Sequence, residues 1–206
     1  CNHKLSSLDL IPIFSYLFLG GKCRYCKEKI RSRYILLEIS SGIVFLLIAL
    51  SLKISIYSSI YEFIKLFIIY LFVTGSFIIG GIDKEKYIIP DSTSLYLIII
   101  SCINILINSF FNIGALNNLL GFIVIPFILL LINFAFKLDK NKEDPIGLGD
   151  IKYLSAIGLF MGFGAQLITF VLSLIITLVG IIIHKYKNIP FGYYISIATV
   201  IVIIFS

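Results

Sequence analysis

The sequence has few charged residues, and this scarcity decides the class of protein. Only 14% of its 206 residues are charged, whereas 59% are hydrophobic, and the mean hydropathy is +1.06. Soluble globular domains carry about 25% charged residues, so this composition excludes a soluble domain. We predict an all-α fold, a polytopic bundle of transmembrane helices.

Methionine is almost missing as well. The chain begins at Cys1, and its one methionine is Met161. A chain with no initiator is expected to be a fragment or a trimmed product that lacks an upstream part. A secretory signal peptide is also not visible, and a protein that inserts through its own hydrophobic helices needs none.

The apolar stretches can be compared with the roughly 20 residues that a helix needs to cross about 30 Å of hydrocarbon. The stretch 151–162 is short for a full crossing, and glycines at 162 and 164 separate it from the next one. A half-helix and one arm of a tight hairpin both fit this stretch. We expect about six or seven spans, at 35–52, 66–82, 92–110, 115–136, 151–162, 165–183 and 189–206.

The distribution of lysine and arginine predicts the orientation, because short cytoplasmic loops accumulate these residues. If the segment before residue 35 is cytoplasmic and each span changes side, 15 of the 17 basic residues are cytoplasmic, all except Lys53 and Lys65. The same alternation requires 151–183 to cross twice or to re-enter. The net charge of +6 then belongs to membrane-flanking loops that attract anionic lipid, and we expect no nucleic-acid partner.

Two aspartates, Asp83 and Asp150, lie where hydrophobic spans meet short polar loops. An ionisable side chain near the centre of a membrane helix costs about 2.5–3.5 kcal/mol, so it indicates function by default. The predicted topology places both at the cytoplasmic ends of their helices, where they can face each other. Two carboxylates that share a proton can hydrolyse a peptide, one drawing a proton from water and the other polarising the carbonyl. The sequence leaves open which of them is the base.

Glycines precede the second aspartate. Gly147 and Gly149 would let the backbone approach a substrate strand closely or adopt conformations closed to other residues, and a plain helix-start turn explains them equally. Asp150 itself also fits the N-cap of a helix that begins at Ile151. The catalytic role and the capping role are compatible.

Two further charged residues lie near these motifs. Asp91, which follows Pro90 just before a span, is interpreted as an N-cap. Lys152 has two interpretations: it orients a catalytic carboxylate, or it extends to the membrane interface. The second is slightly favoured.

The polar segment 1–34 is expected to form a small cytoplasmic unit that carries Cys1, Cys23 and Cys26. Cysteines in the cytoplasm stay reduced, so the Cys23–Cys26 spacing indicates a metal or redox role rather than a structural disulfide. A tetrahedral zinc site needs four ligands, commonly two such pairs. Cys1 fits the second member of another pair whose partner would lie upstream.

Two residues of the apolar spans need separate interpretation. Glu38 lies one turn into the first span, where its carboxylate is costly unless it meets Arg31, Arg33 or a water-filled cavity. Structural ion pairing and a functional role are both open for it. Cys102 lies in an apolar span, and we interpret it as a packed structural thiol.

Four groups of residues occur in an order that resembles one known family. Residues 9–17, 21–26 and 33–38 are similar to the cytoplasmic cysteine domain of the type IV prepilin peptidases. Residues 81–91 resemble the first aspartate motif of that family, and residues 147–152 resemble its Gly-x-Gly-Asp signature. Residues 189–192 resemble a segment before its last helix.

This resemblance implies an aspartic endopeptidase of the bacterial plasma membrane, with Asp83 and Asp150 catalytic and 35–206 as the peptidase domain. Its substrates would be the leaders of prepilins or pseudopilins, cut at the cytoplasmic face. The resemblance also implies zinc on Cys1, Cys23 and Cys26. It further implies N-methylation of the new terminus, with Glu38 as the candidate residue and S-adenosylmethionine as donor. The sequence contains no glycine-rich dinucleotide-type loop for binding this donor. The peptidase step needs no cofactor.

Two other classes of protein compete with the peptidase. A small membrane transporter or ion-binding protein would use the two aspartates to bind protons or cations, and it predicts acids deep within spans and a repeat between halves. Neither is visible in the sequence. A zinc-dependent membrane scaffold without catalysis would tolerate asparagine at both positions.

Overall fold

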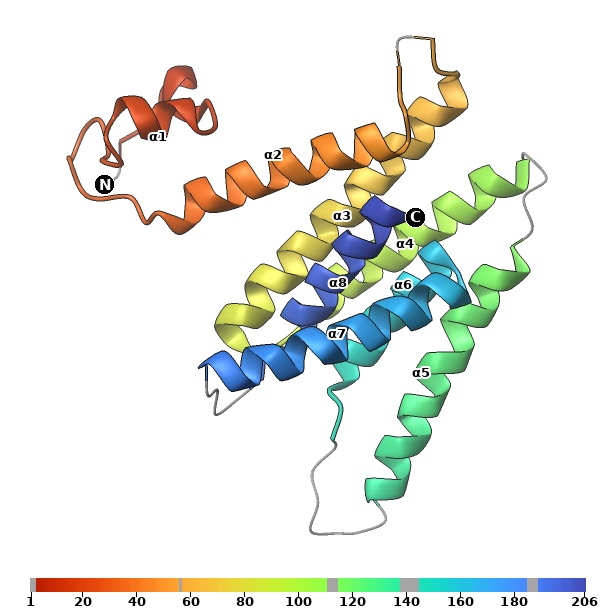
Figure 1. Cartoon of the computed structure of the whole chain (residues 1–206). Helices are drawn as coiled ribbons and strands as arrows, with labels where there is room; N and C mark the ends of the chain where they lie inside the picture. The colour runs from red at the N-terminus through yellow and green to blue at the C-terminus, as the bar shows by residue number, and fades with distance from the viewer. Residues whose placement is uncertain (1–2, 56, 111–114, 138–144, 185–188) are drawn as a thin grey trace. The chain divides into compact units, whose positions relative to one another are not determined.

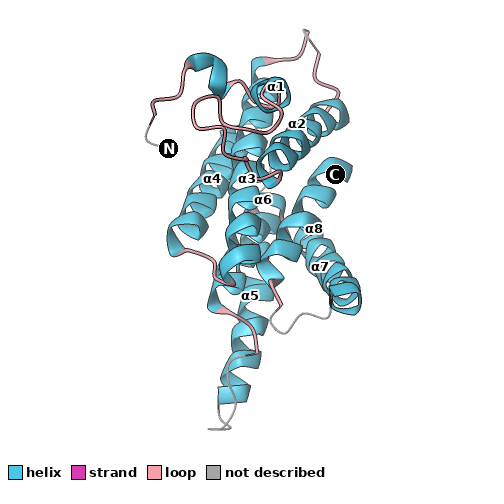
Figure 2. Cartoon of the chain, turned by 90° about the vertical axis from the view of Figure 1, so that its left-hand side faces the viewer, coloured by secondary structure: helices cyan, strands magenta, loops and turns pink. Residues whose placement is uncertain are grey.

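The computed structural model describes residues 3–55, 57–110, 115–137, 145–184 and 189–206. In these ranges the chain is helical, as predicted (Figure 2). Five of the described helices, α2 to α5 and α7, are long and apolar enough to cross a membrane, and α8 is a shorter apolar helix. The helices are a 3-10 helix Ser7–Leu10, α1 Phe14–Phe18, α2 Arg33–Ser51, α3 Ile60–Lys86, α4 Asp91–Phe110, α5 Leu116–Lys137, α6 Leu148–Met161, α7 Phe163–His184 and α8 Phe191–Phe205.

The chain forms two compact units, Cys1–Lys53 and Ile54–Ser206. The first contains the 3-10 helix, α1 and α2, and the second contains α3 to α8. The sequence predicts a different boundary, between a cytoplasmic segment 1–34 and a membrane domain 35–206. That boundary stays a prediction.

Helix α3 is longer than its predicted span of 66–82. It begins after Ser59, whose hydroxyl accepts the Glu62 N–H at 3.3 Å while the Glu62 carboxylate accepts the Ser59 N–H at 2.7 Å. This reciprocal cap satisfies two of the N–H groups that a helix start leaves without partners. Hydropathy marks only the part of a helix that crosses hydrocarbon, so the polar turns at both ends were missed. Asp83 is therefore inside the last turn of α3.

Helix α6 is short, with 14 residues or about 21 Å of length. It ends at Met161, and its C-cap Gly162 has a φ of 85°, in the region that favours glycine. Helix α7 begins at Phe163 (Figure 1). The chain then turns back on itself, because the Gln166 amide donates to the Leu154 carbonyl at 2.8 Å. Of the two interpretations of 151–162, a half-helix and one arm of a tight hairpin, the structure agrees with the hairpin arm.

The end of α6 is held by side-chain amides from two other helices. Asn104 of α4 donates to the Phe160 carbonyl at 3.2 Å, and Asn118 of α5 donates to the Leu159 and Phe160 carbonyls at 2.9 and 3.1 Å. A helix that stops inside a membrane protein leaves carbonyls with no water to bond, so such donors are required. They fix the position of α6 along its axis.

Helix α6 is enclosed by its neighbours. It contacts α4, α5, α7 and α8, while α3 packs against α4 and α8 (Figure 1). The backbones of α5 and α6 meet at two glycines: a Cβ on Gly121 would lie 2.6 Å from the Gly158 carbonyl oxygen. Between α3 and α6 the rings of Phe72 and Phe160 stack with centroids 4.0 Å apart. This packing brings the last turn of α3 to the first turn of α6.

Candidate active site

Asp83 and Asp150 meet at one end of the second unit. Asp83 is in the last turn of α3 and is 5% exposed, and Asp150 is a partly buried residue in the first turn of α6. The two carboxylates are close enough for the negative charge of Asp83 to act on Asp150. Two such like charges disfavour the state in which both are ionised, so the pair favours holding one proton.

The start of helix α8 holds the Asp83 carboxylate. The Tyr193 N–H donates to Asp83 Oδ2 at 3.0 Å. Gly192 leaves the space for this contact, because a Cβ there would lie 3.2 Å from both Cγ and Oδ2 of Asp83. Lys84, the residue after Asp83, lies with its Nζ 4.5 Å from the centroid of the Tyr193 ring. The sequence pointed to residues 189–192 by resemblance alone and gave them no role.

The two glycines before Asp150 serve close packing. Gly147 is the N-cap of α6 with φ −61° and ψ 136°, an ordinary extended backbone, so the expectation of a conformation closed to other residues is wrong for it. A Cβ on Gly147 would lie 2.9 Å from Asp150 Oδ2, and a Cβ on Gly149 would lie 2.9 Å from Ile89 Cβ. Ile89 also limits Gly192, with Cδ1 2.7 Å from a Cβ placed there. Gly147 thus leaves room for the Asp150 carboxylate, and Gly149 lets the start of α6 approach the segment that follows Asp83.

Asn133 fixes the segment before these glycines. From near the C-terminal end of apolar helix α5, the Asn133 amide donates to the Ile146 carbonyl at 2.7 Å and its oxygen accepts the Ile146 N–H at 3.3 Å. Asn133 is buried, and it bonds Ile146 as a neighbouring strand would. Our sequence interpretation missed it, although a carboxamide inside an apolar span is a signal for an interhelical bond.

Several predictions at this end of the molecule need correction. Asp150 is the third residue of α6 and not its N-cap, because the helix begins at Leu148. Asp91 is the first residue of α4 and so lies one position inside the helix. Lys152 Nζ donates to Asp91 Oδ1 at 2.6 Å, a third arrangement besides the two considered. Helix starts shift by a residue or two because short polar turns carry weak boundary signals.

Cys102 is exposed on α4, so its prediction as a packed thiol is wrong. Apolar side chains of a transmembrane helix face lipid as readily as they face other helices, and hydropathy cannot separate the two faces.

In the first unit, Cys23 and Cys26 form a tight turn. The N–H groups of Cys26 and Tyr25 donate to the Cys23 sulfur, with a further contribution from the Cys26 side chain, and these bonds lower the pKa of the Cys23 thiol. Lys27 follows with φ 59°, and the Cys23 N–H donates to the Glu28 carbonyl at 2.9 Å. Backbone donors to sulfur favour the thiolate, the form that binds metal.

The other expected metal ligand, Cys1, lies outside the described residues. In the part of the chain that the structure describes, no group of three or more His, Cys, Asp or Glu residues is arranged to hold a metal. Of the three cysteines expected to bind zinc, the structure describes Cys23 and Cys26.

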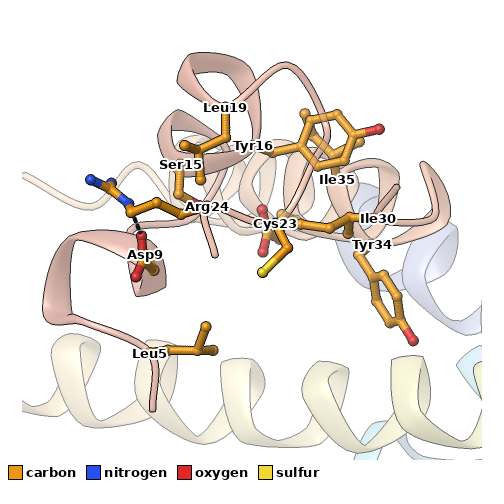
Figure 3. Close-up of a pocket in the computed structure, with 11 residues that line it drawn as sticks. Leu5, Asp9, Ser15, Tyr16, Leu19, Cys23, Arg24, Ile30, Tyr34 and Ile35 are labelled. Atoms are coloured by element: carbon orange, nitrogen blue, oxygen red, sulfur yellow. Dashed lines mark hydrogen bonds and ion pairs between the residues drawn. The ribbon is translucent and has the colours of Figure 1, made fainter. Parts of the chain in front are cut away.

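The first unit contains a cavity of about 170 Å³ (Figure 3), and Glu38 is one of the residues that line it. Its Oε2 accepts the Ile13 N–H at 2.7 Å, so its polar partner is a backbone group of the same unit. Figure 3 shows the Cys23 sulfur pointing into this cavity. The lining residues are Leu5, Asp9, Ser15, Tyr16, Leu19, Cys23, Arg24, Ile30, Tyr34, Ile35 and Glu38.

Asp9 joins three parts of the first unit at the rim of this cavity. Its carboxylate accepts hydrogen bonds from the Ser6 hydroxyl and N–H, from Arg24 Nε at 2.7 Å and from the Tyr25 hydroxyl. The Ser6 hydroxyl and N–H first, and then Arg24 and Tyr25, hold the pKa of Asp9 at about 2. The cysteine turn is thereby tied to the 3-10 helix.

A polytopic helical membrane protein in which two aspartates meet at the ends of their helices has the arrangement of a membrane-embedded aspartic hydrolase. Comparison with known families agrees with this class. Residues 1–52 match the bacterial peptidase A24 N-terminal domain, and residues 70–183 match the type IV leader peptidase family. The chain belongs to the type IV leader peptidase family, and the predicted enzyme class is confirmed.

Three relatives illustrate the similarity. The prepilin leader peptidase/N-methyltransferase of Aeromonas hydrophila is 31% identical over 205 residues, which cover 96% of this chain and 67% of that protein. The protein of the same name from Pseudomonas aeruginosa is 29% identical, with 96% and 67% covered. That of Vibrio cholerae is 30% identical, with 87% and 66% covered. No solved structure matches the chain.

Proposed function

We propose that this protein cuts the leader from type IV prepilins or pseudopilins at the cytoplasmic face of the plasma membrane, with Asp83 and Asp150 as its catalytic carboxylates. The observation that carries the proposal is the approach of two acids that are 67 residues apart in the sequence, at the meeting ends of α3 and α6. The names of the relatives support the substrate class.

The position of the acids favours the peptidase over a transporter. Asp83 is three residues from the end of α3, and Asp150 is in the first turn of α6. A carrier of protons or cations would hold its acids midway along a crossing. Carboxylates at helix ends instead suit a peptide that approaches from the loop side.

The test is co-expression of a prepilin with the wild type and with Asp83→Asn, Asp150→Asn and Asp91→Asn. Asp91 is the matched control, because it is an exposed acid at the start of α4 that pairs with Lys152. We expect the leader to remain attached in the first two variants and to be removed in the third. Leader removal by either Asp83→Asn or Asp150→Asn would contradict the proposed pair.

The first unit is proposed to methylate the new amino terminus, with S-adenosylmethionine as the methyl donor in the cavity beside Glu38. A carboxylate and two tyrosines, Tyr16 and Tyr34, in the lining suit a ligand that carries a sulfonium and an ammonium group. Glu38 would take the proton that the substrate amine loses. The methyltransferase name of the relatives supports this activity.

Glu38→Gln separates the two activities. We expect mature pilin that is cleaved but lacks the mass of one methyl group, because the peptidase carboxylates are unchanged. Glu28→Gln is the control, since Glu28 is an exposed acid of the same unit whose side chain does not line the cavity. Full methylation by Glu38→Gln would remove Glu38 from the reaction.

Zinc binding is proposed on Cys23 and Cys26, with Cys1 as a further ligand. The cysteine turn fits a metal because its N–H groups already favour thiolate at Cys23. Metal analysis of the purified full chain tests this directly. Cys23→Ser and Cys26→Ser should lose zinc and Cys102→Ser should keep it, and equal zinc in all four proteins would refute the site.

A further inference from the structure

The two catalytic candidates have different surroundings, and the difference concerns backbone donors. Helix α8 has 15 residues and begins at Phe191, so the N–H groups of Gly192 and Tyr193 are among the first four, which have no partner within the helix. The Tyr193 N–H donates to Asp83 Oδ2 at 3.0 Å, and the Gly192 N–H also acts on this carboxylate. The start of a helix carries partial positive charge. Asp83 therefore has fixed donors that favour its charged form.

Asp150 lacks such donors. Within the described ranges, no hydrogen bond to its carboxylate is found. It stands in the first turn of α6, whose dipole also favours negative charge, but no N–H reaches its oxygens there. The negative charge of Asp83 acts on it at the same time. Of the two carboxylates, Asp150 is the one that the surroundings favour in the protonated form.

We propose that Asp83 is the general base, Asp150 is the general acid, and the backbone of Gly192 and Tyr193 is the positioning element that sets this division. The proposal rests on the proposed peptidase function, and it supplies the assignment that the sequence leaves open. Asp83 takes a proton from water as the water oxygen bonds to the scissile carbonyl carbon, and Asp150 gives its proton to the carbonyl oxygen. Asp83 then gives its new proton to the leaving nitrogen as the C–N bond breaks, and Asp150 recovers a proton from the hydroxyl that becomes the carbonyl.

Gly192 is required by this geometry. Its missing side chain leaves the Asp83 carboxylate within reach of the α8 donors, since a Cβ would lie 3.2 Å from Cγ and Oδ2 and 2.7 Å from Ile89 Cδ1. Contacts below 3.4 Å force the neighbour to move. A methyl group at residue 192 would therefore push Asp83 off the donors or displace α8.

The test compares Tyr193→Pro with Tyr193→Ala in the full-length protein, with cleavage of a prepilin measured as kcat/KM against pH. Proline removes the N–H and is tolerated in the first turn of a helix, whereas alanine keeps the N–H and removes the ring. The acidic limb of the profile reports ionisation of the base. We expect it to move to higher pH by about one unit in Tyr193→Pro, because one hydrogen bond to the charged form is lost. It should stay in place in Tyr193→Ala.

The comparison of Tyr193→Pro with Tyr193→Ala also controls for the other charged and titratable groups near Asp83. They are Asp150 from α6, Lys84 from α3 itself and the Tyr193 hydroxyl from α8, which lies 3.4 Å from Lys84 Nζ. Both variants keep Asp150 and Lys84 and both lose the hydroxyl, so a difference between them comes from the N–H. A structural role for the ring would change both variants alike.

A second substitution, Gly192→Ala, tests the same assignment in case Tyr193→Pro does not fold. Gly192→Ala should move the acidic limb in the same direction, and Gly81→Ala, which meets nothing within 4 Å although it lies two residues before Asp83, should leave the profile unchanged. An acidic limb that stays in place in Tyr193→Pro and Gly192→Ala overturns the assignment. So does movement of the basic limb alone, which would make Asp83 the acid. Cleavage by Asp83→Asn would instead refute the proposed peptidase function.

Discussion

Removing the two hydrogen bonds between Asn133 and Ile146 should weaken the local structure around Ile146. Asn133→Leu keeps the branching of the side chain at Cγ but deletes both the 2.7 Å and the 3.3 Å hydrogen bonds to the Ile146 backbone. Each is worth about 0.5–1.5 kcal/mol, so we expect about 2 kcal/mol in total, or a factor of about 30 in local opening.

Hydrogen exchange of the Ile146 amide measures this opening directly, because exchange reports local as well as global unfolding. The Ile146 N–H should exchange about 30-fold faster in Asn133→Leu, and Asn133→Asp, which keeps the acceptor, should lie between. Asp150 is four residues further on, and misplacement by about 1 Å can cost up to about 100-fold in rate. Leader cleavage should therefore fall by about tenfold or more.

Asn118→Leu is the matched control. This substitution also removes a part-buried carboxamide from α5, but the Asn118 carboxamide bonds the carbonyls at the far end of α6. Ile146 exchange should match the wild type in this variant. Unchanged Ile146 exchange in Asn133→Leu would show that the two bonds do not hold the loop. Faster exchange with full cleavage activity would show that the peptidase does not need the loop held.

Three further predictions follow from the structure. The Cys23 thiol should be alkylated faster than the Cys26 thiol at neutral pH, because hydrogen bonds to its sulfur, chiefly from the Cys26 N–H, lower the pKa of Cys23. Equal alkylation rates, measured by peptide mass mapping, would contradict this. Asp9 stabilises the first unit above about pH 4, and this contribution should be lost as the pH falls towards its pKa of about 2. Pepsin should therefore cut the wild type more readily over that window, whereas Asp9→Asn should show no such step. Gly158→Leu should lower the midpoint of detergent unfolding strongly, because a Cβ there would clash with the Gly121 carbonyl oxygen, and a wild-type midpoint would refute the close approach.

Much of the membrane fold was predictable because it depends on length and hydropathy. The spans, the short 151–162 segment and the meeting ends of the aspartate helices followed from apolar stretches and the distribution of basic residues. The contacts that position the site did not follow. Asn133, Gly192 and the Tyr193 N–H act through distances between helices, which a single sequence does not contain.

The cysteine turn marks the same limit in the first unit. The spacing of Cys23 and Cys26 predicted a metal or redox role, and the backbone donors to sulfur agree with the thiolate form. The exposure of Cys102 was predicted wrongly, because hydropathy gives no information on which face of a span meets lipid.

The length of α3 has a consequence for hydrolysis. Its 27 residues extend about 40 Å, some 10 Å more than the hydrocarbon layer is thick. The predicted span 66–82 leaves part of this overhang at the end that carries Asp83, three residues from the helix end, and we expect this end to extend towards the headgroup layer, where solvent is plentiful. A hydrolase built this way draws its nucleophile from the interface and needs no conduit through lipid, while its substrate can keep its own apolar helix inserted.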